Sequence, residues 1–254
     1  MEQKQNRKPS LIRKVLIGLA VVIVIAAGAF FWYANDYYKA TVDAIEALQS
    51  DESVTITETD DAITFAPNGE DPEEGIIFYP GGKVESEAYA PLLRSLAEAD
   101  LLVVVAKMPF HLAVFDADAA EAIMEQEDEV EDWYLAGHSL GGVMASSFAA
   151  DQSDEVVGLI FLASYPAGDL TDAPFPVLSI YGSEDEVLSR ESYDEAQGKL
   201  PDDYTEIVLD GGNHGQFGDY GLQEGDGTAT ISTVQQQQQT VEAITSFIEN
   251  NRQQ

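Results

Sequence analysis

Ser139 stands in a pattern that is typical of a nucleophilic serine. Residues 137–141 read Gly-His-Ser-Leu-Gly, the Gly-x-Ser-x-Gly arrangement of a sharp turn between a strand and a helix. Such a turn has no room for a Cβ two residues before or after the serine, and Gly137 and Gly141 meet that requirement. The alternative is an ordinary serine at the start of a helix. The strand-like residues before the pattern and the small residues after it favour the nucleophile.

A candidate acid and a candidate base follow in the chain. Asp185 lies in the sequence Tyr-Gly-Ser-Glu-Asp-Glu, and His214 lies in the sequence Gly-Gly-Asn-His-Gly. A serine hydroxyl becomes a good nucleophile when an imidazole takes its proton, and a carboxylate holds that imidazole in the required tautomer. Two alternatives remain: Glu184 and Glu186 flank the candidate acid, and a histidine among glycines can simply belong to a turn. The order of the three residues favours a Ser-His-Asp triad.

Backbone N–H groups must stabilise the oxyanion that forms when a serine attacks a carbonyl. One donor is expected from Leu140, directly after the serine. The second is expected from the loop that reads Pro-Gly-Gly-Lys-Val after a predicted strand, and we assign it to Gly82 or Lys83. This chemistry requires no cofactor and no metal ion, so we predict neither.

The two other histidines are secondary candidates. His138 directly precedes the serine, and the alternation of side chains along a strand turns it away from the site, so we expect it to pack in the interior. His111 follows the end of a predicted strand, where it either lines the pocket or lies outside it.

From about residue 53 onward, strand-like runs alternate with helical patterns, as in an α/β protein with a mostly parallel sheet and helices on both faces. The first two strands are close enough to pair antiparallel. Each candidate triad residue follows a strand, and the carboxyl ends of parallel strands meet at one crevice. We predict about eight strands: Val54–Glu58, Ala62–Phe65, Gly75–Tyr79, Leu101–Ala106, Trp133–Ala136, Val156–Leu162, Val177–Tyr181 and Thr205–Leu209.

Five helices are predicted between and after these strands: Ala88–Ala99, Ala113–Glu125, Leu140–Ala150, Ser189–Lys199 and Val234–Asn250. The last of them contains five consecutive glutamines at 235–239. Because apolar residues at helical spacing follow this tract, we interpret the glutamines as the solvated face of the helix.

Residues 15–33 are uncharged and mostly apolar, and as a helix they are long enough to cross the roughly 30 Å core of a bilayer. Five Lys and Arg residues lie within residues 1–14, and the positive-inside tendency keeps that segment in the cytoplasm. A cleaved signal peptide is the alternative, since Ala27-Gly28-Ala29 offers small residues, but the apolar run is longer than such peptides usually have. We predict a retained single-pass anchor in the cell membrane, with the remaining chain extracellular.

These patterns divide the chain into four segments: a cytoplasmic basic segment (1–14), a transmembrane anchor (15–33), a juxtamembrane linker (34–52) and one α/β domain (53–254). Within the linker, apolar residues at helical spacing predict a short helix, reaching Ser50, that packs on the domain: Tyr38, Val42, Ile45 and Leu48.

The sequence is strongly acidic. Twelve Lys and Arg against 46 Asp and Glu give a formal charge of −34 at pH 7, and residues 15–254 alone carry −38. Binding to a nucleic acid backbone relies on Lys and Arg, so this charge excludes a nucleic acid partner. The chain contains no cysteine, which excludes disulfides, thiolate metal sites and a cysteine nucleophile.

Four stretches together resemble a known family: Tyr-Pro-Gly-Gly-Lys-Val (79–84), Gly-His-Ser-Leu-Gly-Gly (137–142), Tyr-Gly-Ser-Glu-Asp (181–185) and Gly-Gly-Asn-His-Gly-Gln-Phe-Gly (211–218). From Gly75 to Ile248 the chain is similar to the α/β-hydrolase superfamily, and within it to the compact group of the dienelactone hydrolases. The resemblance implies an α/β-hydrolase fold with elbow, acid turn and histidine loop at the last three stretches. Dienelactone hydrolases have a cysteine and haloalkane dehalogenases an aspartate where this chain has Ser139, so the resemblance implies ester hydrolysis by serine.

We therefore expect an extracellular, membrane-anchored serine hydrolase that cleaves small carboxylic esters through an acyl-enzyme. Only 14 residues separate Leu162 from Val177, where many family members insert a helical cap, so an open site is expected. A thioesterase, a peptidase or an acyltransferase would use the same triad. A catalytically silent surface domain that binds a partner in the same cleft is an alternative of a different kind.

Overall fold

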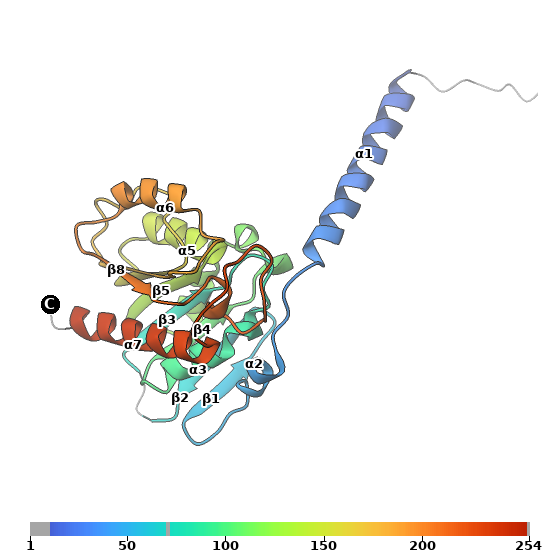
Figure 1. The fold of residues 1–254 in the computed structure, drawn as a ribbon. Coiled ribbons are helices and arrows are strands. Elements are labelled where there is room, and N and C mark those ends of the chain that lie inside the picture. Colours follow the sequence, from blue (N-terminus) through green and yellow to red (C-terminus); the bar gives the residue numbers. More distant parts are fainter. Residues whose placement is uncertain (1–10, 70–71, 253–254) are drawn as a thin grey trace, which may run out of the picture. The chain divides into compact units, whose positions relative to one another are not determined.

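The computed structural model describes residues 11–69 and 72–252, so most of the expected basic segment 1–14 lies outside the described residues. Contacts within the chain form two units, one ending at Asp36 and the other beginning at Tyr37. Figure 1 shows the helices and strands of these units as a ribbon.

The first unit is a single helix, α1 (Leu11–Ala34), of 24 residues. Its most apolar window has a mean hydropathy of 2.7, and at about 1.5 Å per residue the helix is long enough to cross a membrane. The helix begins before the predicted apolar stretch and includes Arg13 and Lys14. This helix is therefore a candidate membrane span.

The second unit is built on an eight-stranded sheet with the order β1-β2-β4-β3-β5-β6-β7-β8. β2 pairs antiparallel with β1 and β4, and the strands from β4 to β8 are parallel, so the predicted antiparallel start and mostly parallel sheet are confirmed. The strands are β1 (Val54–Glu58), β2 (Ala62–Pro67), β3 (Glu74–Tyr79), β4 (Leu102–Ala106), β5 (Asp132–His138), β6 (Gly158–Leu162), β7 (Val177–Gly182) and β8 (Tyr204–Leu209).

Two hydrophobic cores lie on opposite faces of this sheet. Along β5, Tyr134 and Ala136 belong to one core, whereas Trp133 and Leu135 belong to the other. This alternation follows from the two-residue period of a strand. Because both faces are covered, the central strands are buried along nearly their whole length, as expected for parallel strands with helices on both faces.

Helices α3 and α7 lie side by side and contribute to the first core, whereas α4 and α5 contribute to the second (Figure 1). The helices of this unit are α2 (Val42–Glu46), α3 (Ala90–Ala97), α4 (Ala119–Gln126), α5 (Leu140–Asp151), α6 (Arg190–Ala196) and α7 (Thr233–Asn251). Short 3-10 turns occupy Ser86–Tyr89, Pro109–His111, Ala113–Phe115, Gln197–Lys199 and Gly215–Phe217.

Three predicted helices are divided in the structure. The helix predicted over 189–199 is α6 followed by a 3-10 turn. The helix predicted over 88–99 is a 3-10 turn followed by α3, which has Pro91 in its first turn, where the missing N–H has no helical partner to lose. The helix predicted over 113–125 is a 3-10 turn that ends at Phe115; the backbone of the next residue, Asp116, is not helical, and α4 begins at Ala119.

The linker helix is shorter than predicted. Only α2 forms, capped by Thr41, whose Oγ1 accepts a hydrogen bond from the Ala44 N–H at 3.2 Å. Tyr38 instead forms a parallel bridge with the segment after β3: its N–H donates to the Lys83 carbonyl at 2.7 Å, and its carbonyl accepts the Glu85 N–H at 3.0 Å. The backbone of Tyr38 is thus paired like a strand, which excludes a helix at that position.

Candidate active site

Ser139 lies at the sharp turn between β5 and α5. Its φ of 52° and ψ of −122° are unusual for a residue with a side chain, and its hydroxyl makes no capping hydrogen bond to the helix that follows. The turn is held by backbone groups, because the Ser139 N–H donates to the Leu162 carbonyl at 3.0 Å and its carbonyl accepts the Ser164 hydroxyl at 2.7 Å. The helix-cap alternative for this serine therefore does not describe its side chain.

Glycines on either side of the serine allow β5 and α5 to approach closely. A Cβ on Gly137 would lie 2.5 Å from the Gly142 nitrogen, and a Cβ on Gly141 would overlap the Tyr79 carbonyl at the end of β3. Both contacts are with backbone atoms, which cannot move aside as a flexible side chain can. The glycines thus form the turn that presents Ser139.

The structure brings Asp185 and His214 together. Asp185 follows β7 and His214 follows β8, and their Oδ2 and Nδ1 atoms are 2.9 Å apart, with each side chain only 1% exposed. The other oxygen of Asp185 accepts the N–H groups of Val187 and Leu188 at 2.9 and 2.8 Å. A proton on Nδ1 of His214 then points at the carboxylate and leaves Nε2 as the basic nitrogen.

The neighbouring carboxylates do not reach the histidine. Glu184 and Glu186 are exposed, and Oε1 of Glu184 accepts a hydrogen bond from the Ser183 hydroxyl at 3.0 Å. Of the three acids in this turn, Asp185 alone is turned into the interior.

Ser139 and His214 line the same cavity, of about 240 Å³. Apolar and aromatic side chains complete much of its wall: Val143, Tyr165, Val187 and Leu188. Residues 163–176, all of which the structure describes, contain no helix, so no helical cap arises from that segment. An uncharged group of modest size fits this environment better than a charged one.

Two backbone donors remain for an oxyanion. The Lys83 N–H donates to the His111 carbonyl at 2.7 Å. This predicted donor is therefore occupied by a hydrogen bond within the protein. The N–H groups of Gly82 and Leu140 donate no hydrogen bond within the described part of the chain. A Cβ on Gly82 would lie 3.0 Å from Cδ2 of Leu140, so these two residues are neighbours in space. The geometry therefore favours Gly82 over Lys83 beside Leu140.

The model of the α/β hydrolase family matches residues 75–238, more than half of the chain and all of the site just described. The chain belongs to the α/β hydrolase family. It is accordingly a hydrolase enzyme, as the resemblance implied.

Solved structures share the fold of this α/β hydrolase. A predicted CIB-like hydrolase from Thermoplasma acidophilum has 15% identity and a TM-score of 0.57, covering 78% of this chain and 99% of that one. Est1E from Butyrivibrio proteoclasticus has 17% identity and a TM-score of 0.57, covering 80% and 100%. A membrane phospholipase A has 14% identity and a TM-score of 0.59, covering 94% and 99%. No match is found among curated protein sequences.

His138 is a buried structural residue of the hydrolase, as expected. Its Nδ1 is hydrogen-bonded to the Tyr89 hydroxyl at 2.8 Å, and that hydroxyl accepts the Gly81 N–H at 2.9 Å. Burial and the nearby imidazole of His214, whose ring centre is 4.6 Å away, lower the pKa of His138 well below its ordinary value. A neutral His138 thus connects the elbow to the loop that contains Gly82. His111 is not among the residues lining the cavity; its ring stacks on Tyr37, with ring centres 4.1 Å apart.

Asp226 is a site residue that sequence reasoning missed. Its Oδ2 accepts the Gly215 N–H at 2.8 Å, and its Oδ1 accepts the His214 N–H at 3.3 Å and the Glu186 N–H at 3.5 Å. One carboxylate therefore joins the histidine loop of the hydrolase to its acid turn. The Gly-Asp-Gly sequence at 225–227 was the available signal, but it indicates only a turn.

The interpretation of the glutamine tract as a solvated face is wrong at two positions. Gln236 and Gln237 are buried, with exposed fractions of 0% and 6%. Oε1 of Gln236 accepts the Asn213 N–H at 2.9 Å, and its Nε2 donates to the Asn213 carbonyl at 2.8 Å. The tract thus holds the residue directly before His214, which explains why a long polar side chain is buried there.

Proposed function

We propose that this hydrolase cleaves carboxylic esters through an acyl-enzyme on Ser139, with His214 as the general base and Asp185 as its partner. One observation carries the proposal. Ser139, which has a positive φ and whose hydroxyl makes no helix-capping hydrogen bond, lines the same cavity as His214, and His214 is hydrogen-bonded to the buried carboxylate of Asp185. Serine, imidazole and carboxylate are the three groups that this chemistry requires.

In the proposed reaction, Nε2 of His214 takes the proton from the Ser139 hydroxyl while the serine oxygen attacks the carbonyl carbon of the ester. The carbonyl oxygen becomes an oxyanion that accepts hydrogen bonds from the Leu140 and Gly82 N–H groups. The C–O bond to the alcohol then breaks, and the imidazolium returns its proton to the leaving oxygen. A water molecule then loses a proton to the same histidine and attacks the acyl carbonyl. The bond between the acyl group and Ser139 breaks, and the imidazolium returns the proton to the serine oxygen.

Labelling with a fluorophosphonate tests the nucleophile, because only an activated serine reacts quickly with it. The wild type should be labelled, Ser139→Ala should not, and Ser189→Ala should be labelled like the wild type. Ser189 is a suitable control because it lines the same cavity but caps α6 through its hydroxyl. Labelling that persists in Ser139→Ala would contradict the proposal, and a wild type that does not react would favour a catalytically silent binding domain.

A panel of substrates with a constant acyl group identifies the reaction. An oxygen ester should be hydrolysed faster than the matching thioester or amide, and water should be preferred over an alcohol as acceptor. Faster thioester cleavage, amide cleavage or acyl transfer would instead identify a thioesterase, a peptidase or an acyltransferase with the same triad.

We further propose that α1 anchors the enzyme in the cell membrane with the catalytic unit outside. The apolar length of α1 and the five basic residues in 1–14 support this orientation, and one fold neighbour is a membrane phospholipase. Because the chain has no cysteine, single cysteines report topology cleanly. An impermeant maleimide should label Gln239→Cys in intact cells and Ser10→Cys only after lysis. The reverse pattern would reverse the orientation, and a mature chain beginning near Phe30 would indicate a cleaved signal peptide.

A further inference from the structure

The loop after β4 exposes an unusual amount of apolar surface. Residues 108–115 read Met-Pro-Phe-His-Leu-Ala-Val-Phe, and here we call them the apolar loop. The side chains of Phe110, Val114 and Phe115 are 45%, 49% and 51% exposed, and the two phenylalanine rings lie 5.7 Å apart. The other phenylalanines of the second unit are buried or half-buried. The exposed ones are therefore concentrated in this loop.

The backbone of the apolar loop is fixed in an unfavourable conformation. Phe110 and His111 have φ values of 57° and 56°, a region that side-chain-bearing residues seldom occupy. Hydrogen bonds hold it there: the His111 N–H donates to the Met108 carbonyl at 2.9 Å, and the His111 carbonyl accepts the Lys83 N–H at 2.7 Å. A conformation that costs free energy and leaves about half of the Phe110 and Phe115 side chains exposed suggests a surface kept for contact.

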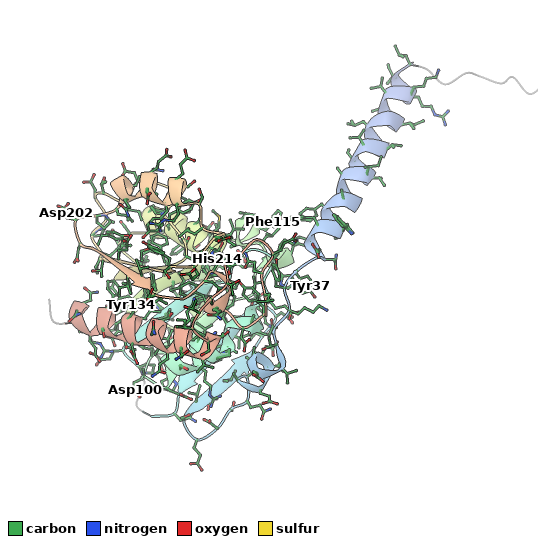
Figure 2. All side chains as sticks on the ribbon, viewed as in Figure 1. Tyr37, Asp100, Phe115, Tyr134, Asp202 and His214 are labelled. Atoms are coloured by element: carbon green, nitrogen blue, oxygen red, sulfur yellow. The ribbon has the colours of Figure 1, made fainter. Side chains whose placement is uncertain are left out.

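The apolar loop borders the candidate oxyanion site. The chain of Leu112 turns inward, and a Cβ on Gly82 would lie 3.8 Å from Cδ2 of Leu112. Figure 2 shows Phe115 and Tyr37 far from Asp100, which precedes β4 at the opposite end of the unit. The exposed apolar surface thus lies at the end of the sheet that carries the site.

The length of the chain ties this loop to the candidate membrane span. The Tyr37 ring stacks on the His111 ring with centres 4.1 Å apart, and Tyr37 is three residues beyond Ala34, the last residue of α1. Three residues extend over at most about 11 Å. If α1 spans a bilayer, its outer end lies at the membrane interface. Tyr37, which contacts the apolar loop, then lies within about 11 Å of that end.

The apolar loop itself contains no Lys, Arg, Asp or Glu. Residues 107–115 contain no acid, although the second unit is strongly acidic. Three of the seven basic residues beyond residue 14 are close in the chain or in the fold. Lys107 directly precedes the loop and pairs through Nζ with Oε1 of Glu58 at 2.5 Å, the backbone N–H of Lys83 donates to the His111 carbonyl, and Nζ of Lys39 lies 5.6 Å from the Tyr37 ring centre. Two acids, Asp116 and Asp118, follow the loop in the chain, and two others, Glu85 and Glu87, lie close enough to act on the charge of His111. Apolar insertion into a zwitterionic layer requires no net positive charge.

We propose that the apolar loop inserts Phe110, Val114 and Phe115 into the outer interface of the bilayer that holds α1, and that this contact presents the site to esters at the lipid surface. The inference rests on the proposed anchoring and ester hydrolysis. It adds a contact between the catalytic unit and the membrane, in addition to α1. It also adds a preference for esters that lie in the membrane over esters that are dissolved in water.

Insertion can be measured without any enzymatic reaction. The full chain, reconstituted in phosphatidylcholine vesicles, is labelled at Val114→Cys or Val208→Cys with an environment-sensitive fluorophore; Val208, on β8, is a matched control at 46% exposure. Lipids brominated near the headgroup should quench the label at Val114→Cys and leave the label at Val208→Cys unchanged. Equal, weak quenching at both positions would overturn the proposal, as would crosslinking of Val114→Cys to a second copy or another protein with no lipid quenching.

A second measurement tests the link to substrate. Phe110→Ser/Phe115→Ser should lower hydrolysis of a long-chain ester in the vesicle by about tenfold and change hydrolysis of a soluble short-chain ester less than about twofold. Unchanged vesicle hydrolysis, or equal loss on both substrates, would contradict the inference. Lipid quenching without any ester hydrolysis would refute the proposed function and support the membrane contact. Hydrolysis of the soluble ester without lipid quenching would support the proposed function and refute the membrane contact.

Discussion

Gln236 and Asn213 hydrogen-bond each other twice, through the side-chain amide of the first and the backbone N–H and carbonyl of the second, at 2.9 and 2.8 Å. The pair connects α7 to the loop that contains His214, one residue further along. A side chain that replaces a missing strand partner in this way holds the loop as a neighbouring strand would.

Gln236→Ala should therefore destabilise the enzyme and slow it. The substitution leaves a buried N–H and a buried carbonyl without partners, and the expected loss is about 3 kcal/mol in the free energy of unfolding. Chemical denaturation measures this loss, and kcat should fall as well. Gln238→Ala is the matched control from the same tract, because Gln238 is exposed; it should stay within about 0.5 kcal/mol of the wild type. Equal effects of the two substitutions would contradict the role assigned to Gln236.

Asp226→Ala should reduce kcat by roughly 10- to 100-fold with a smaller change in KM, because the carboxylate positions His214 and the acid turn without lining the cavity beside Ser139. Steady-state kinetics on a soluble ester and the rate of fluorophosphonate labelling both report this. Glu224→Gln removes an exposed charge two residues away and serves as the control. A loss confined to KM would argue that Asp226 contacts substrate instead.

Among the three acids of the turn, Asp185→Asn should be the damaging substitution. In serine triads, loss of the carboxylate costs on the order of 10⁴-fold in kcat because the imidazole is left in the wrong tautomer. Glu184→Gln and Glu186→Gln should each remain within about threefold of the wild type, since neither side chain reaches the imidazole. A greater loss in Glu184→Gln would reassign the acid.

The buried His138 should make the enzyme sensitive to acid. Its pKa is lowered well below 6.5 in the folded state, first by burial and then by the imidazole of His214, so below pH 6.5 the unfolded chain binds a proton there more readily than the folded chain does. Stability from this group is present above pH 6.5 and falls as the pH decreases, by up to about 1.4 kcal/mol per pH unit. His138→Asn retains a hydrogen-bonding group for the Tyr89 hydroxyl but cannot titrate, so its unfolding free energy should fall less steeply below pH 6.5. Parallel curves for the two proteins would refute the assignment.

The elements and the three candidate triad residues could be predicted because their signals are local. Gly137 and Gly141 flank the serine within five residues, and the strand patterns before Asp185 and His214 place both at the same edge of the sheet. The strand boundaries shifted by at most two residues at either end, as hydrogen bonding extended β2 and β5 beyond their apolar cores.

The supporting residues could not be predicted in the same way. Asp226 acts across 12 residues on His214, and Gln236 acts across 23 residues on Asn213, and neither contact leaves a periodic pattern in the chain. The choice between Gly82 and Lys83 depended on the His111 carbonyl, which reaches the loop from a different strand connection. The residues that hold the candidate site in place are thus specified by the tertiary fold, whereas the candidate reacting residues are marked by the turns in which they lie.

The strand-like pairing of Tyr38 determines where the second unit can be separated from α1. Besides its two bonds to the segment after β3, the Tyr38 hydroxyl accepts the Glu224 N–H at 3.1 Å, and the Thr41 N–H donates to the Asp219 carbonyl at 3.0 Å. A soluble form that begins at residue 53, where the α/β pattern starts, would lack these bonds to both loops around the site. A form that begins at Tyr37 keeps these hydrogen bonds. Secretion or crystallisation of an active domain should therefore require the sixteen additional residues 37–52.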